Sequence, residues 1–227
     1  MQDKTIVRIS GLSGVVGFAV FLAALPLYFV GMVPGVGLED PARFSDAVAK
    51  TQVFQILRSS IADPLIMICL IVFLAGFRHI VRQKRQDMEW MASLAFGVGL
   101  LLVAIELVGD GLQAGAALDT TGRADPSVVR GLMEASFPLY GAIGLIISSL
   151  LLASAGTAVL ATKALHRWTA WTAFGAAALC LAVAPSILGG TDLTGFYTAS
   201  GYAPFLGQAA LLVWFFAASI SMLAKRG

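Results

Sequence analysis

The chain has 227 residues, of which 58% are hydrophobic and only 12% are charged. A typical soluble domain carries about 25% charged residues, so this composition excludes an ordinary soluble fold and indicates a membrane protein. The formal net charge of +2 becomes informative only when the charges are assigned to the two ends of the predicted helices.

Six apolar segments are long enough to cross a bilayer, which takes about 20 residues of helix. We predict membrane-spanning helices at residues 9–32, 56–80, 90–112, 132–160, 168–188 and 202–223. None shows the two-residue alternation of a membrane β-strand, and a helix satisfies its backbone hydrogen bonds within one segment. The first segment exceeds the apolar core of a signal peptide, so we interpret it as a retained helix. The predicted fold is all-α: one domain, residues 1–227, forming an integral membrane bundle of six helices.

The charges of the connections predict which side of the membrane each one faces. Basic residues flank the first segment and follow the second, fourth and sixth: Lys4, Arg8, Arg78, Arg82, Lys84, Arg85, Lys163, Arg167, Lys225 and Arg226. The other connections are mainly acidic, with Glu39, Asp40, Asp46, Asp119, Asp125 and Asp192 against Arg43, Lys50, Arg123 and Arg130. Basic connections stay in the cytoplasm, so both termini are predicted there. These clusters also suit contacts with anionic lipids, whereas a nucleic-acid role is disfavoured.

The connection between the first two spans is predicted to contain a further helix. Pro41 can open a helix, and Phe44, Val48 and Phe54 give an interrupted apolar face. This pattern predicts a helix at about residues 41–55 that lies on the outer leaflet.

A short pattern, W-x-A-x-x-A-F-G, occurs at residues 90–97 and again at 168–175. The inward-running helices share a proline near their outer start, at Pro64, Pro138 and Pro204. One explanation is duplication of a unit, which gives three consecutive helix hairpins. The other is convergence, because Trp anchors helices at the membrane interface and small residues allow close packing.

Ionisable side chains within a span cost roughly 2.5–3.5 kcal/mol near its centre, so they indicate a functional or a paired site. The candidate residues gather toward the outer ends of the second, third and fourth helices: Arg58, Asp63, Glu106, Asp110, Gln113 and Glu134. Glu106 and Asp110 are four residues apart and share one helix face. We expect Asp63 and Glu106 to lie at similar depth and to face the bundle interior, with Arg58 as their counter-charge.

Two interpretations of these residues are open. In one, they form an outward-facing acidic pocket that binds or transports a small cationic or polar solute. In the other, Arg58 pairs with an acid, Asp110 and Glu134 face water, and the protein is a structural or accessory subunit that holds a partner or a lipid. A solute site requires a water-accessible cavity that reaches Asp63 and Glu106. An accessory protein should instead show a wide apolar face and dry, salt-bridged acids. In either case the chain can act alone or within an oligomer.

Metal-dependent and enzymatic functions receive little support from the residues. The two histidines, His79 and His166, stand at the cytoplasmic ends of their helices, on the opposite side from the acids. Cys69 and Cys180 lie in mid-span without a CxxC pattern. We therefore expect no metal site and no cofactor, and we place a membrane-embedded enzyme last among the functional classes.

Three stretches resemble a bacterial "domain of unknown function" family of six-helix inner-membrane proteins. They are Asp40-Pro41-Ala-Arg-Phe with Ala49-Lys-Thr-Gln-Val-Phe54, Lys163-Ala-Leu-His-Arg-Trp168, and Gly207-Gln-Ala-Ala-Leu-Leu-Val-Trp214. The resemblance covers most of the chain and implies a six-helix fold in a bacterial inner membrane. It implies no activity. Members of this family often carry glutamate where this chain has Gln208.

Overall fold

A computed structural model describes residues 2–31, 40–120, 125–191, 195–199 and 201–224, and throughout these residues the regular structure is helical. In chain order the elements are α1 (Gln2–Gly31), α2 (Pro41–Lys50), α3 (Gln52–Leu57), η1 (Arg58–Ala62), α4 (Asp63–Lys84), η2 (Gln86–Met88), α5 (Glu89–Asp119), α6 (Pro126–Pro138), η3 (Leu139–Ile143), α7 (Gly144–Thr162), α8 (Arg167–Val183), η4 (Ala184–Gly189) and α9 (Tyr202–Ala224). The predicted ends and charges at Met32, Glu39, Arg123, Asp192, Lys225 and Arg226 lie outside the described residues.

Among the described residues, six helical stretches are long and apolar enough to cross a membrane. They are Lys4–Phe29, Gln52–Lys84, Gln86–Asp119, Pro126–Thr162, Arg167–Gly189 and Tyr202–Ala224. The predicted all-α fold with six such helices is confirmed, and the chain has the architecture of a multi-pass membrane protein. The second, third and fourth stretches extend beyond the predicted boundaries into the polar connections.

Helix caps explain where α2 and α6 begin. The Asp40 carboxylate accepts the backbone N–H groups of Ala42 and Arg43 at 3.1 and 3.2 Å, and the Asp125 carboxylate accepts that of Ser127 at 2.9 Å. A proline follows each aspartate at the first helical position, where its missing N–H leaves no bond unmade. The same Asp-Pro pair therefore starts both helices, and it starts the fourth stretch six residues before the predicted boundary.

The helix predicted at residues 41–55 is present as α2, followed directly by α3. Its apolar face packs against protein: Phe44 and Val48 are buried beside Val129 and Met133 of α6. Phe54, on α3, is exposed. Thus α2 contributes to a small second core at one end of the bundle.

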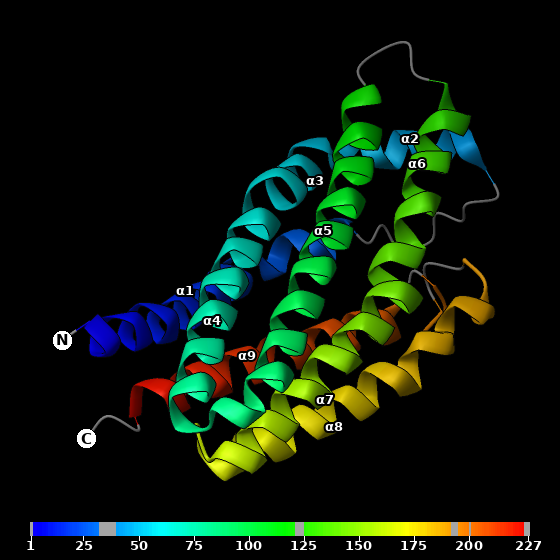
Figure 1. The fold of residues 1–227 in the computed structure, drawn as a ribbon. Coiled ribbons are helices and arrows are strands. Elements are labelled where there is room, and N and C mark those ends of the chain that lie inside the picture. The colour runs from blue at the N-terminus through cyan, green and yellow to red at the C-terminus, as the bar shows by residue number, and fades with distance from the viewer. Residues whose placement is uncertain (1, 32–39, 121–124, 192–194, 200, 225–227) are drawn as a thin grey trace.

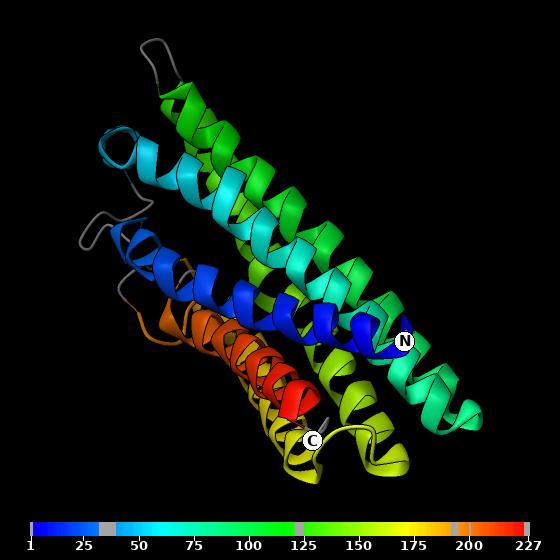
Figure 2. The same cartoon turned by 90° about the vertical axis from the view of Figure 1, so that its left-hand side faces the viewer.

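The six long stretches form a ring in which each helix packs against the next in chain order, and α9 closes the ring against α1. Figures 1 and 2 show the start of α1, the turn between α4 and α5, the connection between α7 and α8, and the end of α9 at one end of this ring. We call it the α4–α5 end, and the opposite one the α5–α6 end. In Figure 2 the group α4–α5–α6 diverges from the group α1–α8–α9 toward the α5–α6 end.

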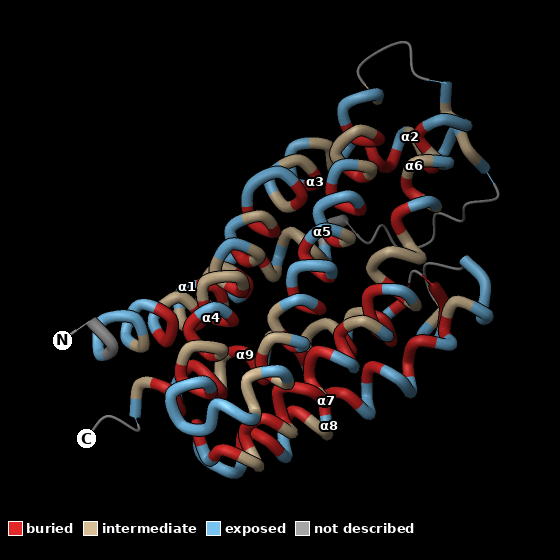
Figure 3. Tube along the Cα trace, in the orientation of Figure 1, coloured by how far each residue is buried: buried red, intermediate tan, exposed pale blue. Residues whose placement is uncertain are grey.

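Buried positions face the interior of this ring and exposed positions face outward (Figure 3). In the repeated pattern, Ala92, Ala95, Ala170 and Ala173 are fully buried, whereas the tryptophans that begin each copy are exposed. The pattern therefore combines close helix packing with outward-facing aromatic rings. Both explanations of the repeat require this arrangement.

The ring interior near the α4–α5 end is filled by four large aromatic side chains, which we call the aromatic layer: Phe73, Phe77, Trp214 and Phe215. The ring of Phe73 meets those of Trp214 and Phe215 edge-on, with centroids 5.9 and 5.0 Å apart. The Trp214 indole N–H donates to the Thr169 carbonyl at 3.1 Å, so its polar atom is satisfied. The aromatic layer joins α4 to α9 across the interior of the ring of helices.

Candidate functional site

The other half of the ring interior contains a cavity of about 200 Å³. This is room for roughly six or seven water molecules, at about 30 Å³ each. Its walls come from α1, α2, α3, η1, α4, α5, α6, η3 and α9. Most lining residues are apolar, and the polar ones are Tyr28, Thr51, Gln55, Arg58, Asp63, Glu106, Gln113, Tyr140 and Gln208. The cavity reaches both Asp63 and Glu106.

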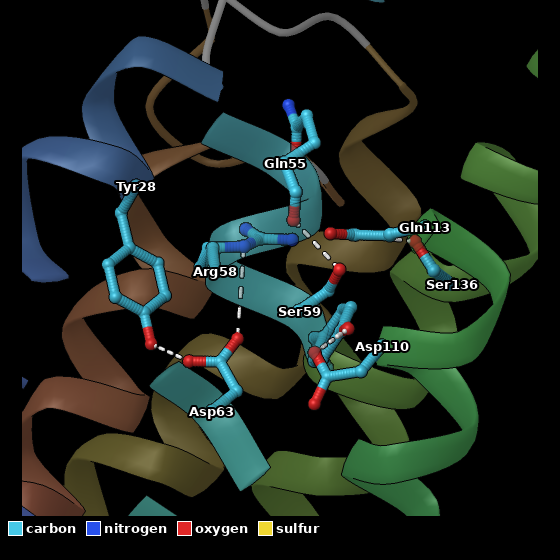
Figure 4. Close-up of polar contacts among 9 residues, drawn as sticks. Tyr28, Gln55, Arg58, Ser59, Asp63, Asp110, Gln113 and Ser136 are labelled. Carbon is cyan, nitrogen blue, oxygen red and sulfur yellow. Dashed lines mark hydrogen bonds and ion pairs between the residues drawn. The ribbon is translucent and has the colours of Figure 1, made fainter. Parts of the chain in front are cut away.

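Asp63 is held between a tyrosine and an arginine on one side of the cavity (Figure 4). The Tyr28 hydroxyl donates a hydrogen bond to Oδ1 of Asp63, and the Arg58 Nε lies 3.8 Å from Oδ2. The guanidinium carbon of Arg58 also lies 5.3 Å from the Tyr28 ring centroid, within the range of a cation–π contact. The Arg58 and Asp63 side chains are only 13% and 10% exposed, so this ion pair is largely removed from solvent.

A π-helical turn brings Arg58 and Asp63 to the same face. Five residues on an α-helix are about 140° apart around the axis, because each residue advances about 100°. In η1 the Asp63 N–H donates to the Arg58 carbonyl, which is the i→i+5 bond of a wider turn. Pro64 lies two residues after this turn. It has no backbone N–H to donate to the carbonyl four residues before it, so the regular α-helical bond is absent there.

A second π-helical turn, η3, positions Tyr140. It directly follows Pro138, and inside it Gly141 has a non-helical backbone with φ −81° and ψ −115°. The Tyr140 hydroxyl donates to Oδ1 of Asp110 at 2.7 Å. A Cβ on Gly109 would lie 2.8 Å from the Tyr140 ring, so glycine is needed for this close approach. Single π-turns inside α-helices are frequent at functional sites.

Glu106 is anchored from the opposite side of the ring by the last helix. The Gln208 amide donates to Oε1 of Glu106 at 2.9 Å and to the Tyr140 carbonyl at 2.8 Å. Glu106 is buried, and the absence of a side chain at Gly144 gives its carboxyl room, since a Cβ there would lie 3.0 Å from Oε1. Gln208 on α9 is therefore bonded both to Glu106 on α5 and to the backbone of Tyr140 in η3.

Four ionisable side chains around the cavity form a cluster that is unbalanced in charge: Arg58, Asp63, Glu106 and Asp110. The carboxyls of Asp63, Glu106 and Asp110 are near enough to repel one another when ionised, and Arg58 is near enough to attract all three. With every group ionised, the four side chains have a formal excess of two negative charges. Buried charge of this kind is costly without a compensating partner, so the cavity favours a cation or protons.

Three atoms of this cluster are buried and have no hydrogen-bond partner among the described residues. They are Nε and Nη2 of Arg58 and Oδ2 of Asp110. Outside the cluster, the Ser186 hydroxyl is also buried and also has no hydrogen-bond partner among the described residues. Buried polar atoms are almost always hydrogen-bonded in native proteins, so these groups are expected to meet a ligand or water.

The structure brings together most of the residues selected from the sequence. Arg58, Asp63, Glu106 and Gln113 line the cavity, and Asp110 joins them through Tyr140. The Gln113 amide donates to the Ser136 hydroxyl at 2.9 Å. Glu134 is not part of the lining; its carboxylate pairs with Nε of Arg130 at 2.9 Å, one helical turn away, and both side chains are about one-third exposed.

Five polar lining residues were not among the candidates selected from the sequence: Tyr28, Thr51, Gln55, Tyr140 and Gln208. The tyrosines stand near the ends of spans, where aromatic residues commonly meet lipid headgroups. In the structure their hydroxyls serve as donors to buried carboxylates. Gln208 had a detectable signal, because it is the one amide side chain in an otherwise apolar final span.

Within the described part of the chain, no three His, Cys, Asp or Glu side chains are grouped so that they could hold a metal ion. No family model, curated protein or solved structure matches this chain. The functional argument therefore rests on the geometry of the cavity.

Proposed function

We propose that the protein binds a small cationic or polar solute in this cavity, as the first step of its transport across a membrane. The single observation that carries the proposal is the cavity of about 200 Å³ whose lining includes the carboxyls of Asp63 and Glu106. Ionisable groups this far inside a membrane bundle are costly and commonly mark solute or ion pathways.

The lining also suits the apolar part of an organic solute. Phe44, Phe137 and Phe205 line the cavity together with the tyrosines. Aromatic faces and carboxylates together attract organic cations, through the ring quadrupole and through charge. The ordinary architecture of a small-molecule site is an apolar cavity with a few convergent polar groups.

The proposal extends to membrane and orientation. We propose a bacterial inner membrane, with the α4–α5 end and both termini in the cytoplasm, so that the cavity opens toward the outer side. The support is the charge of the connections: Arg78, Arg82 and Arg85 lie at the α4–α5 end, and Asp40 and Asp125 cap helices at the other. A Gln83→Cys variant, with Cys69 and Cys180 changed to alanine, should react only with reagents that reach the cytoplasm. Labelling from outside intact cells would reverse the orientation.

Ligand binding is tested with the purified full chain in detergent. The probes are n-butylammonium and its uncharged counterpart 1-butanol, and the readout is the unfolding temperature. A ligand at one hundred times its Kd stabilises a protein by about 2.7 kcal/mol, so the charged probe should raise Tm and the neutral one should not.

The matched variants are Glu106→Gln, inside the cavity, and Glu89→Gln, which changes a carboxylate that pairs with Arg78 elsewhere. Glu106→Gln should abolish most of the shift and Glu89→Gln should retain it. Equal shifts with both probes, or an unchanged shift in Glu106→Gln, would refute the cation site. That result would favour the alternative of an accessory protein whose polar cluster only stabilises the helices.

A further inference from the structure

One edge of the Arg58 guanidinium makes no hydrogen bond, although its Nε forms an ion pair with Asp63. Its Nε and Nη2 atoms are both buried and both lack a hydrogen-bond partner among the described residues. These two nitrogens point their N–H groups in the same direction and form the side-on fork that binds a carboxylate through two parallel hydrogen bonds. These two N–H groups therefore define a binding site for a planar group that accepts two parallel hydrogen bonds.

The protein's own carboxylate does not fill this edge. Oδ2 of Asp63 is 3.8 Å from Nε, which is too long for a hydrogen bond, although it is an ion pair. Oδ1 of the same group is engaged by the Tyr28 hydroxyl, which holds the carboxylate on the side of α1. On the far side of the guanidinium, the Gln113 amide N–H is directed at Ser136 (Figure 4).

Charge restricts what can occupy this edge of the guanidinium. A simple anion would meet Arg58 but would also face the carboxyls of Asp63 and Glu106 in the same cavity. A simple cation would balance the carboxyls but would leave the arginine edge to water, without the charged acceptor that makes its strongest hydrogen bonds. One molecule that carries both charges satisfies both requirements.

Resting on the proposed function, we propose that the solute is a small zwitterion of the amino-acid type. Its carboxylate binds the Nε and Nη2 edge of Arg58, and its ammonium group is directed to the Glu106 carboxyl. Its side chain lies against the apolar wall that includes Phe44 and Phe137. At about 200 Å³, the cavity accommodates a small or medium apolar side chain.

The test compares three probes on the purified full chain in detergent: leucine, its decarboxylated counterpart 3-methylbutylammonium, and its deaminated counterpart 4-methylpentanoate. A charge-assisted bidentate contact is worth about tenfold or more in affinity, so leucine should bind at least about tenfold more tightly than the amine. The carboxylate without an ammonium group should bind most weakly. This ranking requires no variant.

Arg58→Lys keeps the charge but removes the planar fork. It should weaken leucine binding by about tenfold or more while leaving the amine's Kd within about twofold. Arg130→Lys, which changes an arginine outside the cavity lining, is the matched control and should leave both Kd values unchanged.

The outcomes separate the inference from the proposed function. If leucine and the amine bind equally well to the wild-type chain, the zwitterion is refuted and the cation site stands. The same conclusion follows if Arg58→Lys weakens both probes equally. If neither the amine nor leucine binds, both proposals fail.

Discussion

The two halves of the ring interior share α4 and α9, but one half is filled by aromatic rings and the other encloses a polar cavity. Near the α4–α5 end, Phe73, Trp214 and Phe215 fill the space with fully buried rings. One turn further along the same helices, Leu70 and Leu211 form part of the cavity wall, and beyond them stand Arg58 and Gln208. Every aromatic ring in the layer packs against another ring, whereas three buried polar atoms of the cluster have no hydrogen-bond partner among the described residues.

This contrast separates a half that is filled by packed side chains from a half that leaves polar atoms unpaired. A filled apolar interior gains from packing alone. A buried polar cluster with unmet donors loses free energy until a ligand completes it. The aromatic layer therefore supports the fold, whereas the cavity lining keeps polar atoms without hydrogen-bond partners among the described residues.

The largest expected effect is in the aromatic layer. Phe73→Ala removes a fully buried ring that contacts Phe77, Trp214 and Phe215, and should lower the free energy of unfolding by about 3–5 kcal/mol. The measurement is thermal or denaturant unfolding in detergent. Phe54→Ala, at an exposed phenylalanine, is the control and should cost much less. Equal losses would remove the distinction between this layer and the lipid-facing surface.

Arg58→Ala should produce the next largest loss, about 3 kcal/mol, because it leaves the Asp63 carboxylate buried without its counter-charge. A cycle with Asp63→Asn measures the coupling, and the double variant should recover part of the loss. Strictly additive losses would mean that the pair does not stabilise the protein.

Gly109→Ala should destabilise by about 1–3 kcal/mol, since the added methyl group would lie 2.8 Å from the Tyr140 ring and displace it from Asp110. Gly111→Ala, two residues along the same helix, meets nothing within 4 Å and should be neutral or slightly stabilising. For a chain of this size, about 1 kcal/mol corresponds to roughly 2–4 °C in Tm. A Tm loss in Gly111→Ala as large as that in Gly109→Ala would contradict the tyrosine contact.

The smallest effect is expected at the α4–α5 end. Arg78→Gln breaks a 3.0 Å ion pair with Glu89, but the Arg78 side chain is 43% exposed and a second arginine, Arg82, remains 3.5 Å from the same carboxylate. The expected loss is below about 1 kcal/mol, and high salt should reduce it further. A loss comparable to that of Arg58→Ala would show that distance, rather than burial, determines the strength of these pairs.

The fold and most of the cluster could be predicted from the sequence for one reason. Long apolar runs define the spans, and the cost of burying charge makes residues such as Asp63 and Glu106 conspicuous within them. Glu134 was selected on the same ground, but Arg130 stands four residues before it, at the spacing of a helical ion pair. That spacing already favoured a local partner over the cavity.

The remaining parts of the site depend on tertiary structure that a sequence pattern does not contain. Tyr28 and Gln208 come from the first and last spans, which become neighbours only when α9 closes the ring against α1. Arg58 and Asp63 would be far apart on a regular helix and share a face through the π-turn η1. The resemblance to a bacterial family of six-helix membrane proteins remains a prediction.

The aromatic layer also has a consequence for the electrical integrity of a membrane. A continuous water path through the ring would have to wet at least one of these side chains, each of about 150–250 Å². At about 25 cal/mol per Å², wetting one ring costs on the order of 4–6 kcal/mol. Fewer than about one molecule in a thousand would hold such a path open at any moment. The aromatic layer therefore opposes a continuous water path between the cavity and the α4–α5 end.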